Sequence, residues 1–337
     1  MTTDRLAWLA LTAEDAIDPD LPICDPHHHF WDRPSSRYIL EDLLGDTGSG
    51  HNITETVFVE CSSEYLDDGP EALKVVGETV YVQGIADESA TGNHGSTEVA
   101  AGIVSSADFT LGDPVTEVLE AHLEASPNRF RGIRHRAAWD ANVNANVAGA
   151  PPEGILMDSK FREGYARMEP MNLSFEGWVY HPQIPEVTDL ARAFPNITII
   201  LNHIGGPIGI GPYQGRRDEV LETWKQSMAD LATCPNVTVK VGGLGMVFTG
   251  YDWHERDQPI GSEELAEAMK PYYLYCIEQF GPDRCMFESN FPVDKVSYSY
   301  NMMWNAFKRI SEGFSDSEKA SLFRDTARRA YRLGDST

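Results

Sequence analysis

The 337 residues of the chain suit one large α/β domain or two small ones. Hydrophobic residues make up 42% of the sequence and charged residues 23%, which is typical of an ordinary soluble globular protein. The 52 acidic and 27 basic side chains give a net charge of −25, which argues against nucleic acid or an anionic membrane as partner because both need basic patches. A small anionic substrate stays compatible with this charge, since a few local arginines can attract it.

The cysteine and apolar patterns indicate a cytoplasmic protein. The N-terminal 16 residues mix apolar and acidic side chains and lack the features of a secretory signal, and no apolar stretch is long enough to cross a membrane. Five scattered cysteines never occur as C-x-x-C, which predicts buried, reduced thiols and neither a disulfide framework nor a cysteine zinc site. They are Cys24, Cys61, Cys234, Cys276 and Cys285.

Apolar strands and amphipathic helices alternate along the chain after an N-terminal arm of about 20 residues. The predicted strands cover 21–25, 56–61, 100–109, 131–136, 173–180, 196–202, 236–241 and 284–288. The predicted helices cover 69–80, 114–125, 159–169, 184–194, 218–232, 262–280, 300–312 and 316–333, with loops over 33–52 and 137–154. Eight such units without a composition shift predict one (β/α)8 TIM barrel domain over residues 1–337, closed by C-terminal helices.

The segment 21–32, LPICDPHHHFWD, places three histidines at the end of the first predicted strand. Side chains alternate faces along a strand, so His27 and His29 point one way and His28 points the other. Two imidazoles two residues apart can grip one metal ion, because neutral imidazole suits zinc, iron or nickel. The alternative is a histidine run that binds nothing.

Titratable and polar side chains gather at the ends of the other predicted strands, where a TIM barrel carries its chemistry. They are Glu60, Arg131, Arg134, His135, His181, His203, Lys240, Glu288, Asn290 and Asp294. A single histidine in such a place is more often a packed, hydrogen-bonded residue. Histidines that end the first, fifth and sixth strands together indicate a functional site.

The stretches HHHFWD, RGIRH, LNHIGGP, PNVTVKVGGLGM and RCMFESNFPVDK resemble the amidohydrolase superfamily over nearly the whole chain. The likeness is strongest to its amidohydrolase-2 branch, which contains lactonase-like TIM barrels. The resemblance implies a divalent metal ion, zinc before manganese or iron, with His27 and His29 as first ligands. It makes His181 a further candidate ligand, and His203 either a ligand or a group that polarises the substrate carbonyl. Glu60 is a candidate ligand on other grounds, because sets of carboxylates and histidines suit such metals.

One position departs from the family pattern. Relatives read G-S-D-W-P where this chain reads E-S-N-F-P over 288–292, so Asn290 stands in place of the expected catalytic aspartate. An amide cannot take a proton from water at neutral pH. Asp294, Glu288 and Glu60 are the carboxylates available as substitutes, although the alternative role of Asp294 is an ion pair with Lys295 or with a rim arginine.

These observations favour a metal-dependent hydrolase of a small carboxylated lactone, ester or amide, in which a metal-activated water attacks and Asp294 or Glu288 is the base. Arg134 or Lys240 would hold the substrate carboxylate, and Trp139 would wall the pocket. Rim ion pairs and plain packing are the alternative roles of these three side chains.

Three other functions stay open on the same barrel. The loss of the aspartate together with Glu60 and Glu288 suggests a dinuclear iron or manganese oxygenase. A decarboxylase is the second alternative, and a non-catalytic subunit that supports a partner is the third. We expect a small-molecule substrate, no nucleic-acid or membrane partner, and a homo-oligomer or a pairing with a related subunit.

Overall fold

The computed structural model describes residues 3–33, 36–144 and 149–334. Its main sheet has eight parallel strands, and each strand pairs with the next one along the chain. The strands are β1 (Pro22–His28), β4 (Asn52–Val59), β5 (Glu98–Ser105), β6 (Phe130–Ile133), β7 (Ser174–Gly177), β8 (Ile199–Leu201), β9 (Val237–Val241) and β10 (Cys285–Phe287). Repeated strand–helix units produce such an order, because parallel neighbours need a crossover between them.

The first and last strands of this sheet meet at the histidine segment. The Asn290 N–H donates to the carbonyl of His27, and the His29 N–H donates to the carbonyl of Phe291, each over 2.9 Å. A bridge between His28 and Phe291 continues the contact. The sheet is thus nearly closed into a barrel, which confirms the predicted (β/α)8 fold, and the closure places the segment after β10 against the histidines.

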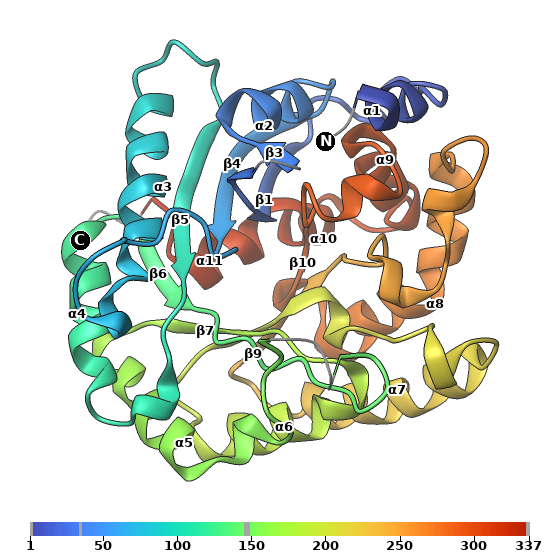
Figure 1. The fold of residues 1–337 in the computed structure, drawn as a ribbon. Helices are drawn as coiled ribbons and strands as arrows, with labels where there is room; N and C mark the ends of the chain where they lie inside the picture. Colours follow the sequence, from blue (N-terminus) through green and yellow to red (C-terminus); the bar gives the residue numbers. More distant parts are fainter. Residues whose placement is uncertain (1–2, 34–35, 145–148, 335–337) are drawn as a thin grey trace.

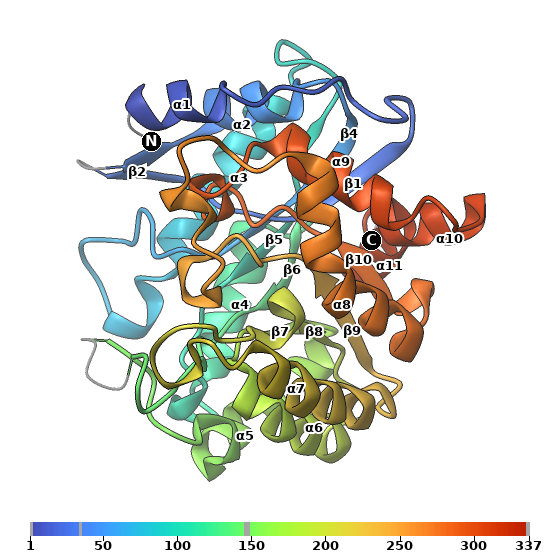
Figure 2. The same ribbon diagram turned by 90° about the vertical axis from the view of Figure 1, so that its right-hand side faces the viewer.

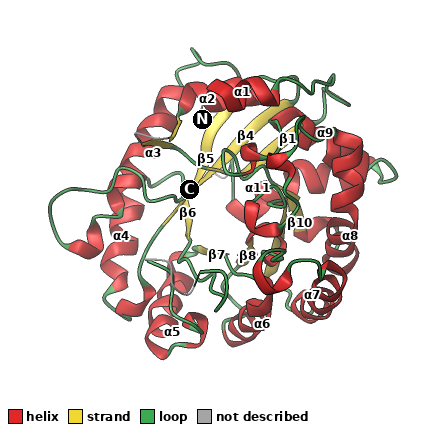
Figure 3. Ribbon diagram, turned by 45° about the vertical axis from the view of Figure 1, so that its right-hand side comes forward, coloured by secondary structure: helices red, strands yellow, loops and turns green. Residues whose placement is uncertain are grey.

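Helices surround the strands, as Figure 3 shows in red around yellow, and they follow one another around the barrel in Figures 1 and 2. They are α3 (Val76–Ser89), α4 (Val115–Ala125), α5 (Ser159–Tyr165), α6 (Ile184–Ala193), α7 (Arg217–Ala232), α8 (Ser262–Phe280) and α9 (Tyr300–Ile310). Their buried sides pack on the outward-facing strand residues in one continuous core that includes Leu119, Trp224 and Tyr273. This layer holds the strands in place from outside.

The inside of the barrel has its own apolar cluster. Val57 of β4, Ile200 of β8 and Tyr331 belong to it. Tyr331 ends α11 (Thr326–Tyr331), which α10 (Asp316–Ala320) precedes, and the guanidinium of Arg332 donates to the carbonyl of Arg131 near the start of β6. The C-terminal segment therefore closes the end of the barrel where the strands begin. The other end is left for a site.

Residues 33–52, expected to form a loop, contain regular structure instead. Here β2 (Trp31–Arg33) pairs with β3 (Ser36–Tyr38), and α2 (Leu40–Thr47) follows. The buried residues of α2 recur at helical spacing, but the short length of the helix and the glycines after it conceal that pattern in the sequence.

The helix expected over 69–80 begins only at Val76. Residues 71–73 form a separate short turn, and the Leu66 N–H donates to the carbonyl of Lys74 over 2.9 Å, which holds this stretch as a loop over the end of β4. The N-terminal arm includes α1 (Thr3–Leu9) and is fixed to α8 through Glu14, whose carboxylate accepts the N–H of Ser262 over 2.9 Å. Among the helices of the described ranges, none has the length and apolar character required to span a membrane.

Candidate active site

A cavity of about 660 Å³, called the main cavity below, opens where the barrel strands end. It is lined by His29, Trp31, Arg33, Cys61, Ser62, Arg134, Arg136, Trp178, His203, Met246, Asn290 and Val293. These residues follow every barrel strand except β5, which is the placement that a TIM-barrel active site shows. Four residues singled out in the sequence, His29, Arg134, His203 and Asn290, meet here.

Three imidazoles lie together at the base of this cavity. The ring centre of His27 is 4.9 Å from that of His29 and 4.5 Å from that of His203. Nδ1 of His29 lies 2.7 Å from the carbonyl oxygen of Val59, and Nδ1 of His203 lies 2.7 Å from Oε1 of Glu288. Both Nδ1 atoms face acceptors, so we assign the proton to Nδ1, which leaves Nε2 of each ring as the atom with a free lone pair.

Burial keeps these histidines neutral. It lowers the pKa of His29 to about 3 and holds the pKa values of His27 and His203 well below 6.5, with the charges of Lys240 and Arg134 adding to the effect at both residues. A neutral imidazole can accept a proton or bind a metal ion, whereas an imidazolium can do neither.

Glu288 links two of the three histidines. Its Oε1 accepts from His203, and its Oε2 lies 2.7 Å from Nδ1 of His27. Burial raises the pKa of Glu288 to about 8 and Glu176 adds to this, while the ammonium of Lys240 acts in the opposite direction. Lys240 is itself buried beneath the histidines, with Nζ 2.9 Å from Oε2 of Glu176 and 3.2 Å from Nδ1 of His27.

Two glycines after β9 make this arrangement sterically possible. A Cβ atom on Gly243 would lie 2.5 Å from Cβ of His203, and one on Gly242 would lie 2.4 Å from Cγ of Glu288. Gly243 also has a φ of +81°, which side-chain-bearing residues rarely adopt. His203 itself adopts a left-handed backbone with a φ of 52°, a conformation that costs free energy and that functional sites often retain.

Two arginines and one buried carboxylate form a separate network, which is charged, in contrast to the neutral histidines. Glu60 accepts from Nε of Arg134 over 2.7 Å, and from Nε and Nη2 of Arg136 over 3.0 and 2.8 Å. Burial alone would raise the pKa of Glu60, but the charges of Arg134 and Arg136 outweigh it and hold the pKa at about 2. The side chain of Arg136 is 49% exposed, so this arginine extends from the pair into the cavity.

Asn290 is oriented by a carboxylate behind it. Its Nδ2 donates to Oδ1 of Asp294 over 2.7 Å, which turns the amide oxygen away from Asp294. Oδ2 of Asp294 accepts from the hydroxyl of Tyr298 over 2.6 Å and from the N–H of Gly245 over 2.9 Å. Burial raises the pKa of Asp294 to about 7 against the effect of these donors. Asp294 is fully buried and lies outside the lining of the main cavity, as does Glu288.

The structure places three other predicted residues apart from the cavity. His181 contacts Tyr213 edge-on with ring centres 5.1 Å apart, and the Ile208 N–H donates to its Nδ1 over 3.3 Å. Trp139 donates its backbone N–H to Gln183 over 2.8 Å, and Lys240 is covered by the histidines. None of the three lines the main cavity.

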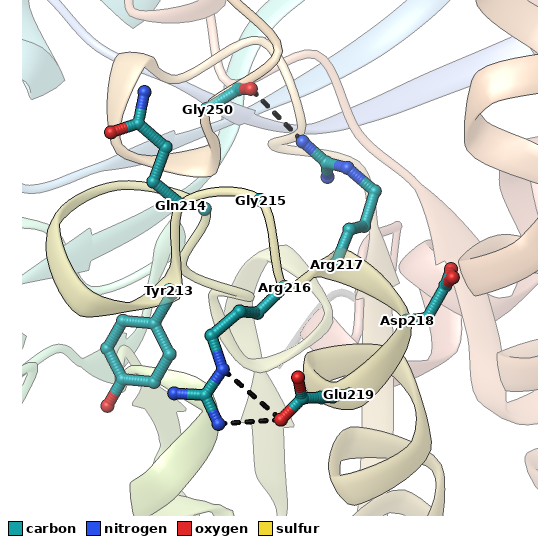
Figure 4. A pocket seen from close by; sticks show the side chains of 9 residues that line it. Tyr213, Gln214, Gly215, Arg216, Arg217, Asp218, Glu219 and Gly250 are labelled. Carbon is teal, nitrogen blue, oxygen red and sulfur yellow. Dashed lines mark hydrogen bonds and ion pairs between the residues drawn. The ribbon is translucent and has the colours of Figure 1, made fainter.

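A second hollow, of about 530 Å³, lies beside Tyr213 at the start of α7 (Figure 4). Its two arginines are already engaged. Arg216 pairs with Glu219 over 2.6 Å, and Arg217 donates to the carbonyl of Gly250 over 3.1 Å. Both arginines are thus taken up by contacts within and between the loops that line this hollow, and neither is left to define an anion site there.

Sequence reasoning missed Trp31, Arg33, Arg136 and Trp178, all of which line the main cavity. A signal for them exists, because the alternation that pairs His27 with His29 continues to residues 31 and 33. The same period joins 134 to 136.

The described residues contain one group of three that can hold a metal ion, namely His27, His203 and Glu288, whose ligand atoms lie within 4.8 Å of one another. Two neutral imidazoles and a carboxylate suit a divalent transition metal. Oε2 of Glu288 is buried and lacks an aligned hydrogen bond although Nδ1 of His27 is 2.7 Å away. This unsatisfied oxygen fits a shared cation, so the residues present fit the metal that the family resemblance implies.

The chain also resembles known proteins in sequence and in fold. The model of the amidohydrolase family Amidohydro_2 matches residues 24–333. The chain belongs to the amidohydrolase family. This amidohydrolase is 35% identical over 336 residues to the uncharacterized protein y4mH of Sinorhizobium fredii, which covers 93% of this chain and 99% of the relative.

The amidohydrolase is also 26% identical over 317 residues to an L-fucono-1,5-lactonase of Burkholderia multivorans, across 92% of this chain and 95% of the relative. Its fold matches a crystal structure of a B. multivorans amidohydrolase with bound zinc, with a TM-score of 0.71, 22% identity and coverage of 92% and 99%. Family membership and the lactonase relative identify the chain as a hydrolytic enzyme.

Proposed function

We propose that this amidohydrolase opens a small anionic lactone in the main cavity. The observation that carries the proposal is the presence in one cavity of a neutral imidazole backed by a carboxylate, His203, and of arginines with exposed guanidinium groups, Arg33 and Arg136. The lactonase relative from B. multivorans supports a lactone over an amide.

The arginines support a substrate with a carboxylate. The chain as a whole carries a net charge of −25, so an anion approaches only where local cations reverse the field. Nε and Nη2 of Arg136 are directed at Glu60 and Ser62, which leaves Nη1 for a ligand. A guanidinium gives a directed clamp on a carboxylate, whereas the buried ammonium of Lys240 cannot reach one.

His203 is the proton acceptor that this geometry supports. A water beside its Nε2 gives up a proton as its oxygen adds to the lactone carbonyl, and the ionised form of Glu288 stabilises the resulting imidazolium through Nδ1. The proton then passes to the ring oxygen as the ester C–O bond breaks. The amide oxygen of Asn290 can hold the water, because Asp294 fixes the amide nitrogen.

A divalent ion, with zinc as our first choice, would be held by His27, His203 and Glu288. When bound, it would supply a polarised carbonyl and a water of lowered pKa. His203 would then be a ligand, and its proton-accepting role would fall to another group. Metal content therefore distinguishes the two roles of His203.

The other functions receive less support. An oxygenase with two metals needs a second set of ligands. Glu60 is the carboxylate expected to contribute to it, but both of its oxygens accept hydrogen bonds from Arg134 and Arg136. A decarboxylase is the second candidate, because the same arginines can hold a carboxylate beside His203. A non-catalytic subunit is less well supported, because it would not require the carboxylate of Glu288 behind His203.

The test measures acid release from each member of a panel of carboxylated lactones. Elemental analysis gives the metal content of the purified protein. We expect turnover by the wild type, and a loss in kcat of at least about 100-fold in His203→Gln. His181→Gln is the matched control, since His181 also ends a barrel strand but lies outside the cavity, and it should stay within about twofold. Carbon dioxide in place of acid, or full activity in His203→Gln, would contradict the proposal.

A further inference from the structure

A third hollow, called the distal cavity below, adjoins the main cavity on the same face of the barrel. It has a volume of about 460 Å³ and shares Ser62 and Arg136 with the main cavity. Its other lining residues come from the segments that follow β4, β5 and β6, so it also lies where strands end. The two cavities are therefore parts of one extended cleft with Arg136 at their junction.

The residue at this junction is held rigidly. Glu60 is 1% exposed and binds the guanidinium of Arg136 through both carboxylate oxygens, while Ser62 accepts from Nη2 over 2.9 Å. Burying a carboxylate costs free energy of desolvation, even when it accepts hydrogen bonds from two arginines. The effect of Glu60 here is to fix the half-exposed guanidinium of Arg136. Such preorganisation is what a binding site needs, because a ligand then loses less free energy in ordering it.

Apolar groups provide most of the lining of the distal cavity, beside the hydroxyls of Ser62, Ser106 and Thr110. Val75, Ala107, Ile155 and two consecutive prolines, Pro151 and Pro152, contribute to this apolar lining. The fixed φ of proline stiffens that part of it. His135 also lines the cavity, and its ring stacks on Phe109 with centres 5.9 Å apart, so it is packed rather than mobile.

The charges of the distal cavity exclude a second anion. Asp108 and Glu60 are its acidic members, and Arg136 is its cation. Arg136 is already paired with Glu60, so a carboxylate deep in this cavity would face Asp108 without a free cation. Burial keeps His135 neutral by lowering its pKa, and it therefore adds no charge.

We infer that the enzyme acts on a lactone that carries an uncharged, largely apolar arm, with the ring in the main cavity and the arm in the distal cavity. The substrate carboxylate lies between them on Nη1 of Arg136. The volume of the distal cavity is enough for an arm of several non-hydrogen atoms, because one water takes up about 30 Å³ in the liquid. This inference rests on the proposed lactone hydrolysis.

The first experiment compares carboxylated lactones that differ only in the arm: hydrogen, methyl, butyl and phenyl. We expect kcat/KM of the wild type to rise at least tenfold from hydrogen to butyl. Val75→Trp, which fills the distal cavity, should reduce the ratio of butyl to hydrogen to about one. Val80→Trp is the matched control, since Val80 is 55% exposed on α3 and away from the cavity, and it should keep the wild-type ratio.

A binding measurement separates this inference from the proposed hydrolysis. Calorimetry with benzoate and the three butylbenzoate isomers should show at least tenfold tighter binding of one isomer to the wild type and to Val80→Trp, and no such gain in Val75→Trp. If that pattern appears without lactone turnover, the distal site stands and the hydrolysis is wrong. Lactone turnover with equal kcat/KM for all arms, or equal benzoate and butylbenzoate binding, would overturn the distal site.

Discussion

His203 shows how much of the site depends on single backbone positions. Its imidazole meets Glu288 only because Gly243 leaves the space beside its Cβ empty and because its own backbone takes a left-handed conformation. The two adjacent glycines in the sequence V-G-G-L-G at the end of β9 are therefore part of the site, although neither has a side chain that can react. Glycine here provides space rather than flexibility.

We predict that Gly243→Ala lowers kcat/KM at least about 100-fold, because the new methyl group would displace His203 from its position, and a shift of about 1 Å in a reacting group costs that much. Gly92→Ala is the matched control. Gly92 has nearly the same φ, +79°, but nothing within 4 Å of an added Cβ, so it shares the backbone strain without the clash. Equal losses of activity in the two variants would contradict the steric role of Gly243.

Single side chains were predictable where strand alternation and charge coincide. His27, His29 and His203 lie together as the strand-end rule suggests, because a closed parallel barrel brings strand ends into one ring. The sequence could not show that Lys240 is covered by histidines or that His181 turns to Tyr213, since both follow from packing between distant segments. Asp294, a candidate base, does not reach the main cavity directly in this structure, because Asn290 lies between its carboxylate and the cavity.

At the scale of elements, sharp local signals gave accurate boundaries. The helix predicted over 262–280 is present over Ser262–Phe280, where glycines at 261 and 281 flank a long amphipathic run. Tyr272 and Tyr273 of that helix are buried in the core and give no support to the expected homo-oligomer, which stays a prediction.

Elements whose form depends on tertiary contacts were harder to predict. The strand expected over 100–109 ends at Ser105. Ala107 and Phe109 are buried in the segment that follows, so the apolar pattern continues beyond the strand. The β2–β3 hairpin and α2 were missed because both are short, yet β2 supplies Trp31 and Arg33 to the site. Functional loops therefore hide structure that apolar periodicity alone does not reveal. Part of the predicted loop 137–154 lies outside the described residues.

At the scale of the whole molecule, the acidic surface contrasts with the arginines of the cleft. The network of Glu60, Arg134 and Arg136 ties the ends of β4 and β6 together. The pKa of Glu60 in the folded chain, about 2, lies below its ordinary value of 4.5. Folding therefore favours the ionised form, and this stabilisation is present above pH 4.5 and is lost as the pH falls towards 2.

We predict that Glu60→Gln lowers the free energy of unfolding at pH 7 by about 3 kcal/mol, because two arginines lose their buried partner. The variant should also lose less stability than the wild type between pH 4.5 and pH 2. Urea unfolding across this range measures both effects. Asp230→Asn, which breaks the exposed pair with Arg192, is the control and should change stability by less than about 1 kcal/mol. An unchanged acid profile in Glu60→Gln would remove this network from the stability of the fold.

The effect of substrate charge on turnover tests most directly whether the cleft binds an anionic lactone. The measurement compares kcat/KM for a carboxylated lactone with that for the same lactone carrying a neutral carboxamide. We predict at least a tenfold preference for the carboxylate, which weakens as salt screens the arginines and disappears in Arg136→Gln. Equal kcat/KM for the two lactones, or a preference that survives in Arg136→Gln, would contradict the assignment of the cleft to an anionic lactone.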